Sequence, residues 1–397
     1  HVTGSPDERG YYSGVRGQLV EAGKETAKAI FVKGSRKGGS TIIKPNMVGG
    51  SKAWDPTSGI NTSADFIAGF VESMRELGNT NIMVGERGGG IKHHRGMGVY
   101  TAFDPHNVQM IEALYPTFAD YRKDEVNWHK VPNPVVWKNI PTWRPIGDKD
   151  NFFISMPKLK NHNLGLTTLS TKNLQGAVPF GYGQFCWPWQ SYKAIAHGIP
   201  GVDFKRDFVA DYQRRVEAGF IKHKAAGYKY WDYEGSYDKY QAKGGWDAFR
   251  KIMDDQKKVN EFAKDLTNLM WDELWCQRAL DSSSALPRSL NIIEGVIGRD
   301  GSGFDTGKDQ LCNIIVAGLS RTETDAIGSY IMGHDPAQLY YTRIAKERGL
   351  GECDPNKIDV YWIRRGEAVR ANLAELPRYR LGVNMHTHAE TGQRLFW

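Results

Sequence analysis

The chain has 397 residues, of which 40% are hydrophobic and 24% are charged, as in an ordinary globular protein with room for two packed units. Its formal net charge is +7, but lysine and arginine are spread along the chain in no long run. A nucleic-acid-binding arm is therefore not predicted. A mildly basic enzyme that binds a small anion is the interpretation we prefer, and a polyanionic partner stays open.

The four cysteines lie far apart, at Cys186, Cys276, Cys312 and Cys353, with no CxxC pair. We therefore expect no cysteine-bound iron–sulfur cluster, and the spacing does not decide whether disulfides form. No run approaches 18 consecutive apolar residues, so no transmembrane helix is predicted. The chain begins at His1 rather than Met, which fits removal of a secretory signal and fits a shortened chain equally well. We favour the first explanation and expect an extracytoplasmic protein.

The first clear pattern is a strand, a glycine-rich loop, a helix and a second strand. The strands are expected over 41–50 and 81–90, and the amphipathic helix between them is capped by Thr62 or Ser63 and ended by Gly78. This βαβ order predicts a parallel sheet, and ligands of such sheets bind at the carboxyl ends of the strands.

The same alternation continues along the chain. Further strands are expected over 29–34, 150–160, 289–301, 311–320 and 357–363, and further helices over 107–118, 322–333 and 336–351. Residues 181–285 interrupt the pattern, because they are rich in Trp and Tyr and show helical periodicity over 246–280. The prediction is an α/β protein with a mainly parallel, Rossmann-like sheet, helices on both faces, and an inserted helical subdomain or lid.

Five regions follow from these patterns. They are an N-terminal extension (1–40), the first part of the α/β core (41–180), the insert (181–285), the second part of the core (286–365) and a C-terminal tail (366–397).

Two loops after the first strands carry candidate binding residues. Pro45 ends the first strand, so Lys44 and Asn46 project at the carboxyl edge of the sheet as a cation beside an amide. That pair suits a carboxylate or a phosphate, although a solvated turn explains it equally well. Glu86 and Arg87 precede three glycines that allow a ligand to approach the backbone closely, and a mobile solvated loop is again the alternative.

A third cluster follows the strand over 150–160. Lys158, Lys160 and Lys172 place three cations around His162 within fifteen residues, and several hydroxyl side chains lie between them. The cluster emerges at the same edge as Lys44, which favours anion binding or proton transfer over a solvated basic loop.

Several segments resemble the uncharacterised DUF362 family. They are IIKPNMV, the VGE of NIMVGERGG, FISMPKLKNHNLGLTTLSTKNLQGAVP, IIEGVIGRDGSGFDTG and DAIGSYIMGHDP. The resemblance spans about residues 40–363 and covers 181–285 poorly; the activity of the family is not generally established. Two departures stand out: Glu294 precedes Gly295 where the family usually has Asp-Gly, and the ferredoxin-like cysteines of some members are missing.

A more distant resemblance is to the lactate racemase group. Its signature here is the ten-residue spacing from His162 to Lys172, together with the pair His94–Arg95. The resemblance implies a nickel-pincer nucleotide anchored by the lysine, with histidines that ligate nickel or move the α-proton of the substrate. His94 and His162 are accordingly the candidate ligands of nickel or another divalent metal.

The resulting hypothesis is an enzyme that acts on a small carboxylate or phosphorylated compound. His162 is the general acid/base, because its reference pKa lies near neutrality, and Lys172 is its catalytic partner. The ligand-binding set comprises Lys44, Asn46, Glu86, Arg87, Lys158, Lys160, Asn173 and Glu294. The competing hypothesis is a non-catalytic binding or assembly protein, which forms homo-oligomers or binds a protein partner through the Trp-rich residues 181–285.

Overall fold

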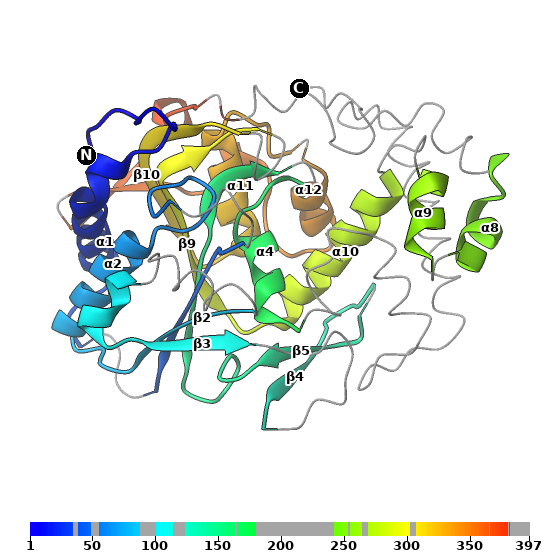
Figure 1. Ribbon diagram of the computed structural model, residues 1–397, viewed down its shortest axis with the longest axis horizontal. Helices are drawn as coiled ribbons and strands as arrows, with labels where there is room; N and C mark the ends of the chain where they lie inside the picture. Colours follow the sequence, from blue (N-terminus) through cyan, green and yellow to red (C-terminus); the bar gives the residue numbers. More distant parts are fainter. Residues whose placement is uncertain are drawn as a thin grey trace.

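The structure is a computed structural model with a central β-sheet between two layers of helices (Figure 1). It describes residues 1–34, 39–48, 55–87, 101–113, 124–135, 137–162, 165–179, 242–252, 255–263, 269–301, 307–337, 339–364, 366–379 and 381. The strands are β1 (Thr41–Pro45), β2 (Ile82–Arg87), β3 (Gln109–Ala113), β4 (Val126–Lys130), β5 (Asn139–Trp143), β6 (Phe152–Met156), β7 (Lys158–His162), β8 (Leu166–Thr167), β9 (Ser289–Arg299), β10 (Asp309–Gly318), β11 (Tyr361–Arg364) and β12 (Glu367–Arg370). The helices are α1 (Arg16–Ile30), α2 (Ala64–Glu76), α4 (Ser170–Asn173), α8 (Gly245–Ile252), α9 (Gln256–Ala263), α10 (Leu269–Ala285), α11 (Arg321–Ile331) and α12 (Tyr340–Glu347). Short 3₁₀ turns are η1 (Ser13–Val15), η2 (Thr101–His106), η3 (Leu174–Ala177), η4 (Pro355–Lys357) and η5 (Leu373–Glu375).

The central sheet is mainly parallel, as predicted. Its order is β3-β2-β1-β6-β9-β7, with β10 antiparallel to β9 and β8 antiparallel to β7. β6 and β7 act as one interrupted strand beside β9, because Ser155 faces Asn291 and Lys158 faces Glu294 in the same register. Pro157 marks the interruption, since proline has no backbone N–H to donate to a ladder.

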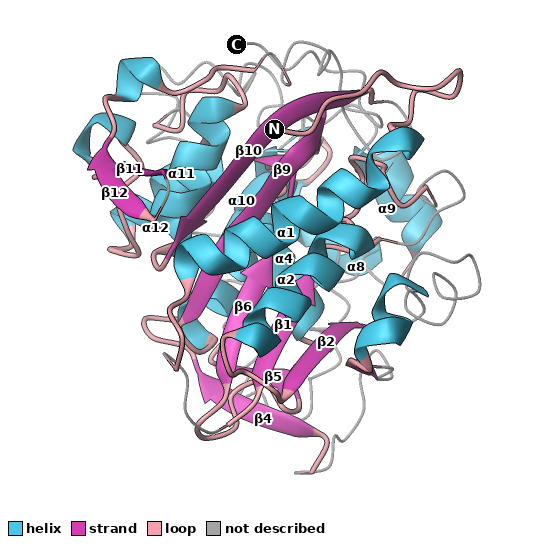
Figure 2. Cartoon of the chain, turned by 90° about the vertical axis from the view of Figure 1, so that its left-hand side faces the viewer, coloured by secondary structure: helices cyan, strands magenta, loops and turns pink. Residues whose placement is uncertain are grey.

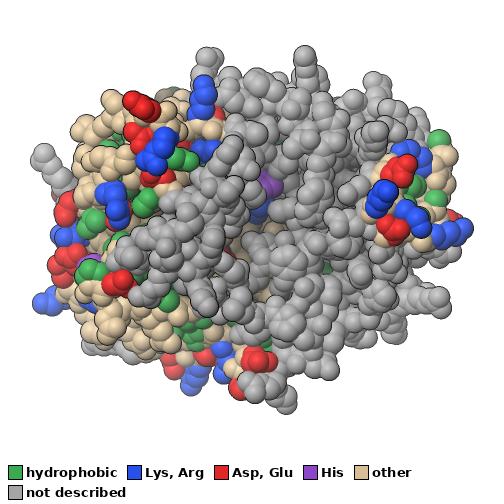
Figure 3. Space-filling view, viewed as in Figure 1, with side chains coloured by type: hydrophobic (Ala, Val, Ile, Leu, Met, Phe, Trp, Pro, Cys, Tyr) green, Lys and Arg blue, Asp and Glu red, His purple; other side chains and the backbone are tan. Residues whose placement is uncertain are grey.

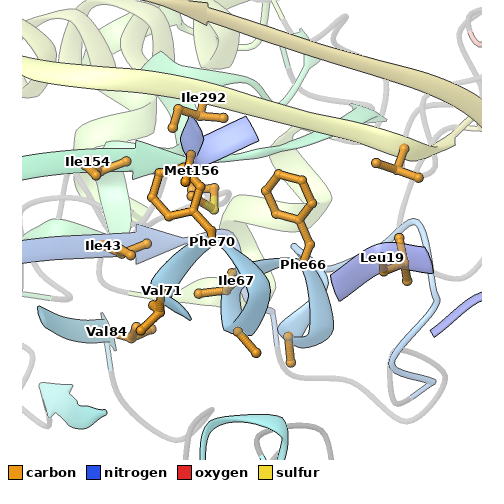
Figure 4. Close-up of a cluster of buried hydrophobic side chains, with 14 of the residues drawn as sticks. Leu19, Ile43, Phe66, Ile67, Phe70, Val71, Val84, Ile154, Met156 and Ile292 are labelled. Carbon is orange, nitrogen blue, oxygen red and sulfur yellow. The ribbon is translucent and has the colours of Figure 1, made fainter. Parts of the chain in front are cut away.

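One face of the sheet is covered by α1 and α2 (Figure 2). Ile43, Ile154 and Ile292 point from three neighbouring strands toward α2, where they meet Phe66 and Phe70 (Figure 4). The Ser63 side chain accepts a hydrogen bond from the backbone N–H of Phe66, so Ser63 rather than Thr62 caps α2.

The opposite face is covered by α4 and α11. Leu159 and Ile293 of the sheet pack there with Leu169, which precedes α4. α11 lies close against this layer, because a Cβ atom added at Gly328 would lie 2.6 Å from Ile293 Cδ1 and 2.9 Å from Leu169 Cδ1. The predicted helices on both faces are thus confirmed.

Three predicted elements are wrong in type or place. Residues 29–34 close α1 and continue as a loop, where a strand was predicted. The predicted helix over 107–118 contains β3, because pairing with β2 outweighs the local helical pattern. The final strand begins at Tyr361 and forms a separate hairpin with β12.

The N-terminal region belongs to the packed core. A Cβ atom added at Gly23 of α1 would lie 2.0 Å from the carbonyl oxygen of Phe66, and one added at Gly69 of α2 would lie 1.9 Å from that of Val20. These glycines bring the two helix backbones into close contact, which the polar sequence before residue 40 did not indicate.

The inserted region is described only in its second half. The described residues between 242 and 285 are largely helical, through α8, α9 and α10, in agreement with the predicted periodicity. Residues 180–241 lie outside the described residues, and the five predicted regional boundaries remain predictions. None of the described helices combines the length and apolar character that crossing a bilayer requires.

Candidate functional site

A buried ion pair joins the ends of β1 and β2. Lys44 Nζ lies 2.6 Å from Glu86 Oε2, and both side chains are at most 3% exposed. The same ammonium donates hydrogen bonds to the Pro45 carbonyl oxygen (2.7 Å) and to Asn173 Oδ1 (3.0 Å). Three predicted binding residues, from β1, β2 and α4, therefore meet at the carboxyl edge of the sheet.

Close packing holds this pair in place. A Cβ atom added at Gly176 would lie 2.1 Å from Glu86 Oε1 and 2.7 Å from Lys44 Nζ, so only glycine fits there without a shift. Trp143 Nε1 donates to the Gly176 carbonyl oxygen (2.9 Å), which fixes η3 against β5. On the α4 side, Asn173 Nδ2 donates to the Lys44 carbonyl oxygen and to Ser155 Oγ, both at 3.0 Å.

Lys172 differs from the other lysines of the cluster. It lies on α4, whose remaining residues Ser170, Thr171 and Asn173 are buried, whereas Lys172 is only half-buried. Within the part of the chain that the structure describes, its ammonium has neither a hydrogen-bond partner nor an ion-pair partner. Figure 3 shows lysine and arginine side chains (blue) at several separate places on the described part of the face drawn in Figure 1.

Unpartnered polar groups lie on the same segments. Asn46 Oδ1, Thr168 Oγ1 and both polar atoms of the Gln175 side chain are buried and have no hydrogen-bond partner among the described residues. Buried polar groups are hydrogen-bonded in nearly all proteins, so such groups call for a bound molecule or water. Asn46 was predicted to bind ligand, and Thr168 is one of the hydroxyl side chains noted in the lysine cluster, whereas Gln175 was not predicted.

A second buried ion pair joins Lys158 Nζ to Glu294 Oε2, and neither side chain is exposed. Backbone groups complete it: Glu294 accepts hydrogen bonds from the N–H groups of Ser63 (3.2 Å) and Val296 (3.0 Å). Lys160 Nζ, beside it on β7, donates to the Ile60 carbonyl oxygen at 2.6 Å. These contacts fasten the loop before α2 to the sheet.

The two ion pairs lie on opposite faces of the sheet. Ile43 and Ile292 face α2, and side chains alternate along a strand, so Lys44 faces α4 while Glu294 faces α2. Their hydrogen-bond partners agree, because Lys44 binds Asn173 of α4 and Glu294 binds the Ser63 cap of α2. The lysines expected in a single cluster are therefore divided between two layers.

For the remaining predicted residues, the structure describes fewer contacts or no side chain at all. His162 ends β7, is 4% exposed and pairs through its backbone with Leu166; among the described contacts, no hydrogen bond joins it to Lys172. Arg87 ends β2, and its side chain lies outside what the structure describes, as does all of His94. Within the described residues no group of three His, Cys, Asp or Glu side chains is arranged to hold a metal ion, so the metal ligands remain predictions.

Asp325 of α11 reaches α4 and was missed as a site residue. Its carboxylate accepts hydrogen bonds from the backbone N–H groups of Ser170 (2.6 Å) and Thr171 (2.8 Å). Burial raises the pKa of Asp325 to about 6. Thr322, Asp325 and Ser329 recur at helical spacing and are all buried, and this pattern was the available signal.

His334, which follows α11, is also fully buried. Its Nε2 lies 2.9 Å from Asn161 Oδ1. Since Asn161 Nδ2 donates to the Leu381 carbonyl oxygen, Oδ1 is free to accept, and we assign the proton to His334 Nε2. Burial lowers the pKa of His334 to about 3, so the ring is neutral in the folded protein.

These features define a mainly parallel α/β protein with an incomplete polar cluster at the carboxyl edge of its sheet, between β1, β2 and α4. A family model described as "Domain of unknown function (DUF362)" matches residues 41–330, and the chain belongs to this family. No curated protein and no solved structure matches the chain, so the resemblance to lactate racemases stays a prediction.

Proposed function

We propose that the protein binds a small anion, a carboxylate or a phosphorylated compound, beside α4, and that Lys172 is the cation that binds it. The observation that carries the proposal is that Lys172 is half-buried while its ammonium has no partner among the described residues. A positive charge in a partly dry environment is stabilised strongly by a bound anion, because the local dielectric constant is lower than that of water.

The neighbouring charges support this choice of residue. Lys44 and Lys158, which were also expected to bind the anion, are each neutralised by a buried glutamate. Their role in the proposal is to shape the edge of the sheet, with Asn173 and Glu86 as the groups that hold Lys44. The unpartnered atoms of Asn46, Thr168 and Gln175 supply hydrogen bonds for a neutral part of the ligand.

The chemistry proposed for this site is proton transfer, with His162 as the general acid/base. An imidazole has a reference pKa of about 6.5 and exchanges protons near neutral pH. Lys172 holds the carboxylate or phosphate group of the ligand. His162 then accepts a proton from, or donates one to, a neighbouring atom of the same ligand. His162→Gln is expected to remove turnover while leaving anion affinity nearly unchanged.

Calorimetric titration with inorganic phosphate and with acetate tests the binding proposal. Wild-type protein is expected to bind at least one of these anions, and Lys172→Ala to weaken that binding by more than about tenfold, or about 1.4 kcal/mol. Lys149→Ala is the matched control, because Lys149 is an exposed lysine on the turn before β6.

Equal binding by Lys172→Ala and Lys149→Ala would refute the role of Lys172. Native mass spectrometry of the purified protein adds a second measurement, since a co-purified small molecule should be lost in Lys172→Ala alone. A protein that binds neither anion, carries no small molecule and assembles through residues 181–285 would instead support the binding or assembly class.

A further inference from the structure

α4 is a four-residue helix that cannot be stable by itself, because a helix of this length is far below the size that is even marginal in water. Its cap residue Leu169 has no side chain that can accept a hydrogen bond from the first turn. The segment that carries Lys172 therefore depends on other elements for its position.

Asp325 supplies the missing cap from α11. One carboxylate oxygen accepts from Ser170 N at 2.6 Å and the other accepts from Thr171 N at 2.8 Å, and the Asp325 side chain is fully buried. These are the first two N–H groups of α4, which would otherwise be buried without a partner. Charge-assisted hydrogen bonds of this kind are stronger than neutral ones.

The other end of α4 is fixed as firmly. Asn173 accepts from Lys44 Nζ and donates to the Lys44 carbonyl oxygen and to Ser155 Oγ, each at 3.0 Å. Lys172 lies between these two attachments and is the one residue of α4 that is not buried. Any rotation of the short helix would break bonds at one end or the other.

We infer that Asp325 is a positioning residue, which holds α4 in the orientation that presents the Lys172 ammonium to the bound anion. The inference rests on the proposed anion-binding function. α11 suits this role, because Ser320 caps it and its Ile327 and Ile331 pack in the core, so Asp325 extends from a fixed helix. Asp325 itself does not touch the anion in this arrangement.

Asp325→Asn tests the inference, because the amide replaces one accepting oxygen with an N–H₂ group that faces a backbone donor. Anion affinity for phosphate and acetate is expected to fall about tenfold, measured by calorimetry at a temperature where the variant is folded. The matched control is Asp281→Asn. Asp281 is another buried carboxylate that accepts backbone N–H bonds, from Val135 and Trp137. It also pairs with Arg348 at 2.6 Å, and the contacts described for it involve no residue of α4.

The double variant Asp325→Asn/Lys172→Ala separates positioning from general destabilisation. If Asp325 acts through Lys172, the double variant binds the anion no more weakly than Lys172→Ala alone. An equal loss of affinity in Asp325→Asn and Asp281→Asn would overturn the inference, and so would a further fall in affinity in the double variant. Wild-type binding unchanged by Lys172→Ala would instead overturn the proposed function, which keeps the two failures distinct.

Amide hydrogen exchange of the wild-type protein adds a measurement that needs no variant. The Ser170 and Thr171 amides are expected to be protected as strongly as those of β9, since a carboxylate fixed in the core holds them. Exchange at the rate of an unprotected helix end would overturn the inference even if Asp325→Asn failed to fold.

Discussion

The two buried lysine–glutamate pairs have the same chemistry and different surroundings. On the α2 face, Lys158 and Glu294 are completed by backbone N–H groups of Ser63 and Val296. On the α4 face, the Lys44–Glu86 pair contacts Asn173 of α4, and the neighbouring Lys172 has no partner among the described residues. A buried ion pair is therefore not by itself the mark of a ligand site. The half-buried Lys172, without a partner among the described residues, distinguishes the α4 face.

The largest effects should come from breaking each pair in the same way. Lys44→Met and Lys158→Met each leave a buried glutamate without its cation, which is expected to cost about 3–5 kcal/mol of unfolding free energy. The double variants Lys44→Met/Glu86→Gln and Lys158→Met/Glu294→Gln remove both charges and should recover most of this loss. Urea unfolding of the four proteins measures the differences.

The two double variants are expected to differ in their affinity for the anion. Lys158→Met/Glu294→Gln is expected to keep its affinity for the anion, whereas Lys44→Met/Glu86→Gln should weaken it, because Asn173 loses the ammonium that fixes the end of α4. If the α2-face variant lost anion binding and the α4-face variant kept it, the site would have been assigned to the wrong face.

The sequence predicted the parallel sheet and the polar residues at its carboxyl edge because these depend on local patterns. Hydrophobic runs ending in glycine or proline located β1, β2 and β9, and the predicted residues Lys44, Glu86 and Asn173 do contact one another through Lys44. These contacts are predictable because parallel strands bring their carboxyl ends together at one edge of the sheet, whatever the conformation of the loops.

Partners across the sheet were not predictable in the same way. The interruption at Pro157 and the register of β7 decide that Lys158 faces Glu294, and hence α2, and neither feature is visible in residue spacing. The contact of Asp325 with α4 joins residues 155 positions apart. Long-range packing of this kind also turned the predicted helix over 107–118 into β3.

A substitution at Gly176 tests how tightly the Lys44–Glu86 pair is packed, and its expected effect on stability is smaller. Gly176→Ala places a Cβ atom 2.1 Å from Glu86 Oε1, and the required shift should cost about 1–3 kcal/mol and weaken anion binding. Gly17→Ala is the control: it lies in α1 with nothing within 4 Å of the new atom, and should stabilise the protein by up to about 1 kcal/mol. Equal melting temperatures for the two variants would contradict the tight packing around Glu86.

The α4 face also carries two titrations of opposite sign, whose net effect on the stability of the wild-type protein is small. Asp325 has its pKa raised by burial from 3.8 to about 6, so the folded state holds this proton more tightly and the contribution of Asp325 to stability falls as pH rises from 4 to 6. His334 has its pKa lowered by burial from 6.5 to about 3, so its contribution is present above pH 6.5 and is lost as pH falls. Each slope amounts to about 1.4 kcal/mol per pH unit, and between pH 4 and 6 the two nearly cancel.

Substituting one group should uncover the slope of the other. Relative to wild type, His334→Gln is expected to become less stable as pH rises from 4 to 6, because the Asp325 slope is no longer opposed. Asp325→Asn should show the reverse, with stability rising over the same interval. Urea unfolding at pH 4, 5 and 6 gives each difference directly, and curves that run parallel to wild type would show that these two groups do not titrate as their burial implies.

A carboxylate that charges only above about pH 6 also predicts that the hydrogen bonds to Ser170 and Thr171 strengthen there. Anion binding should therefore weaken below pH 6.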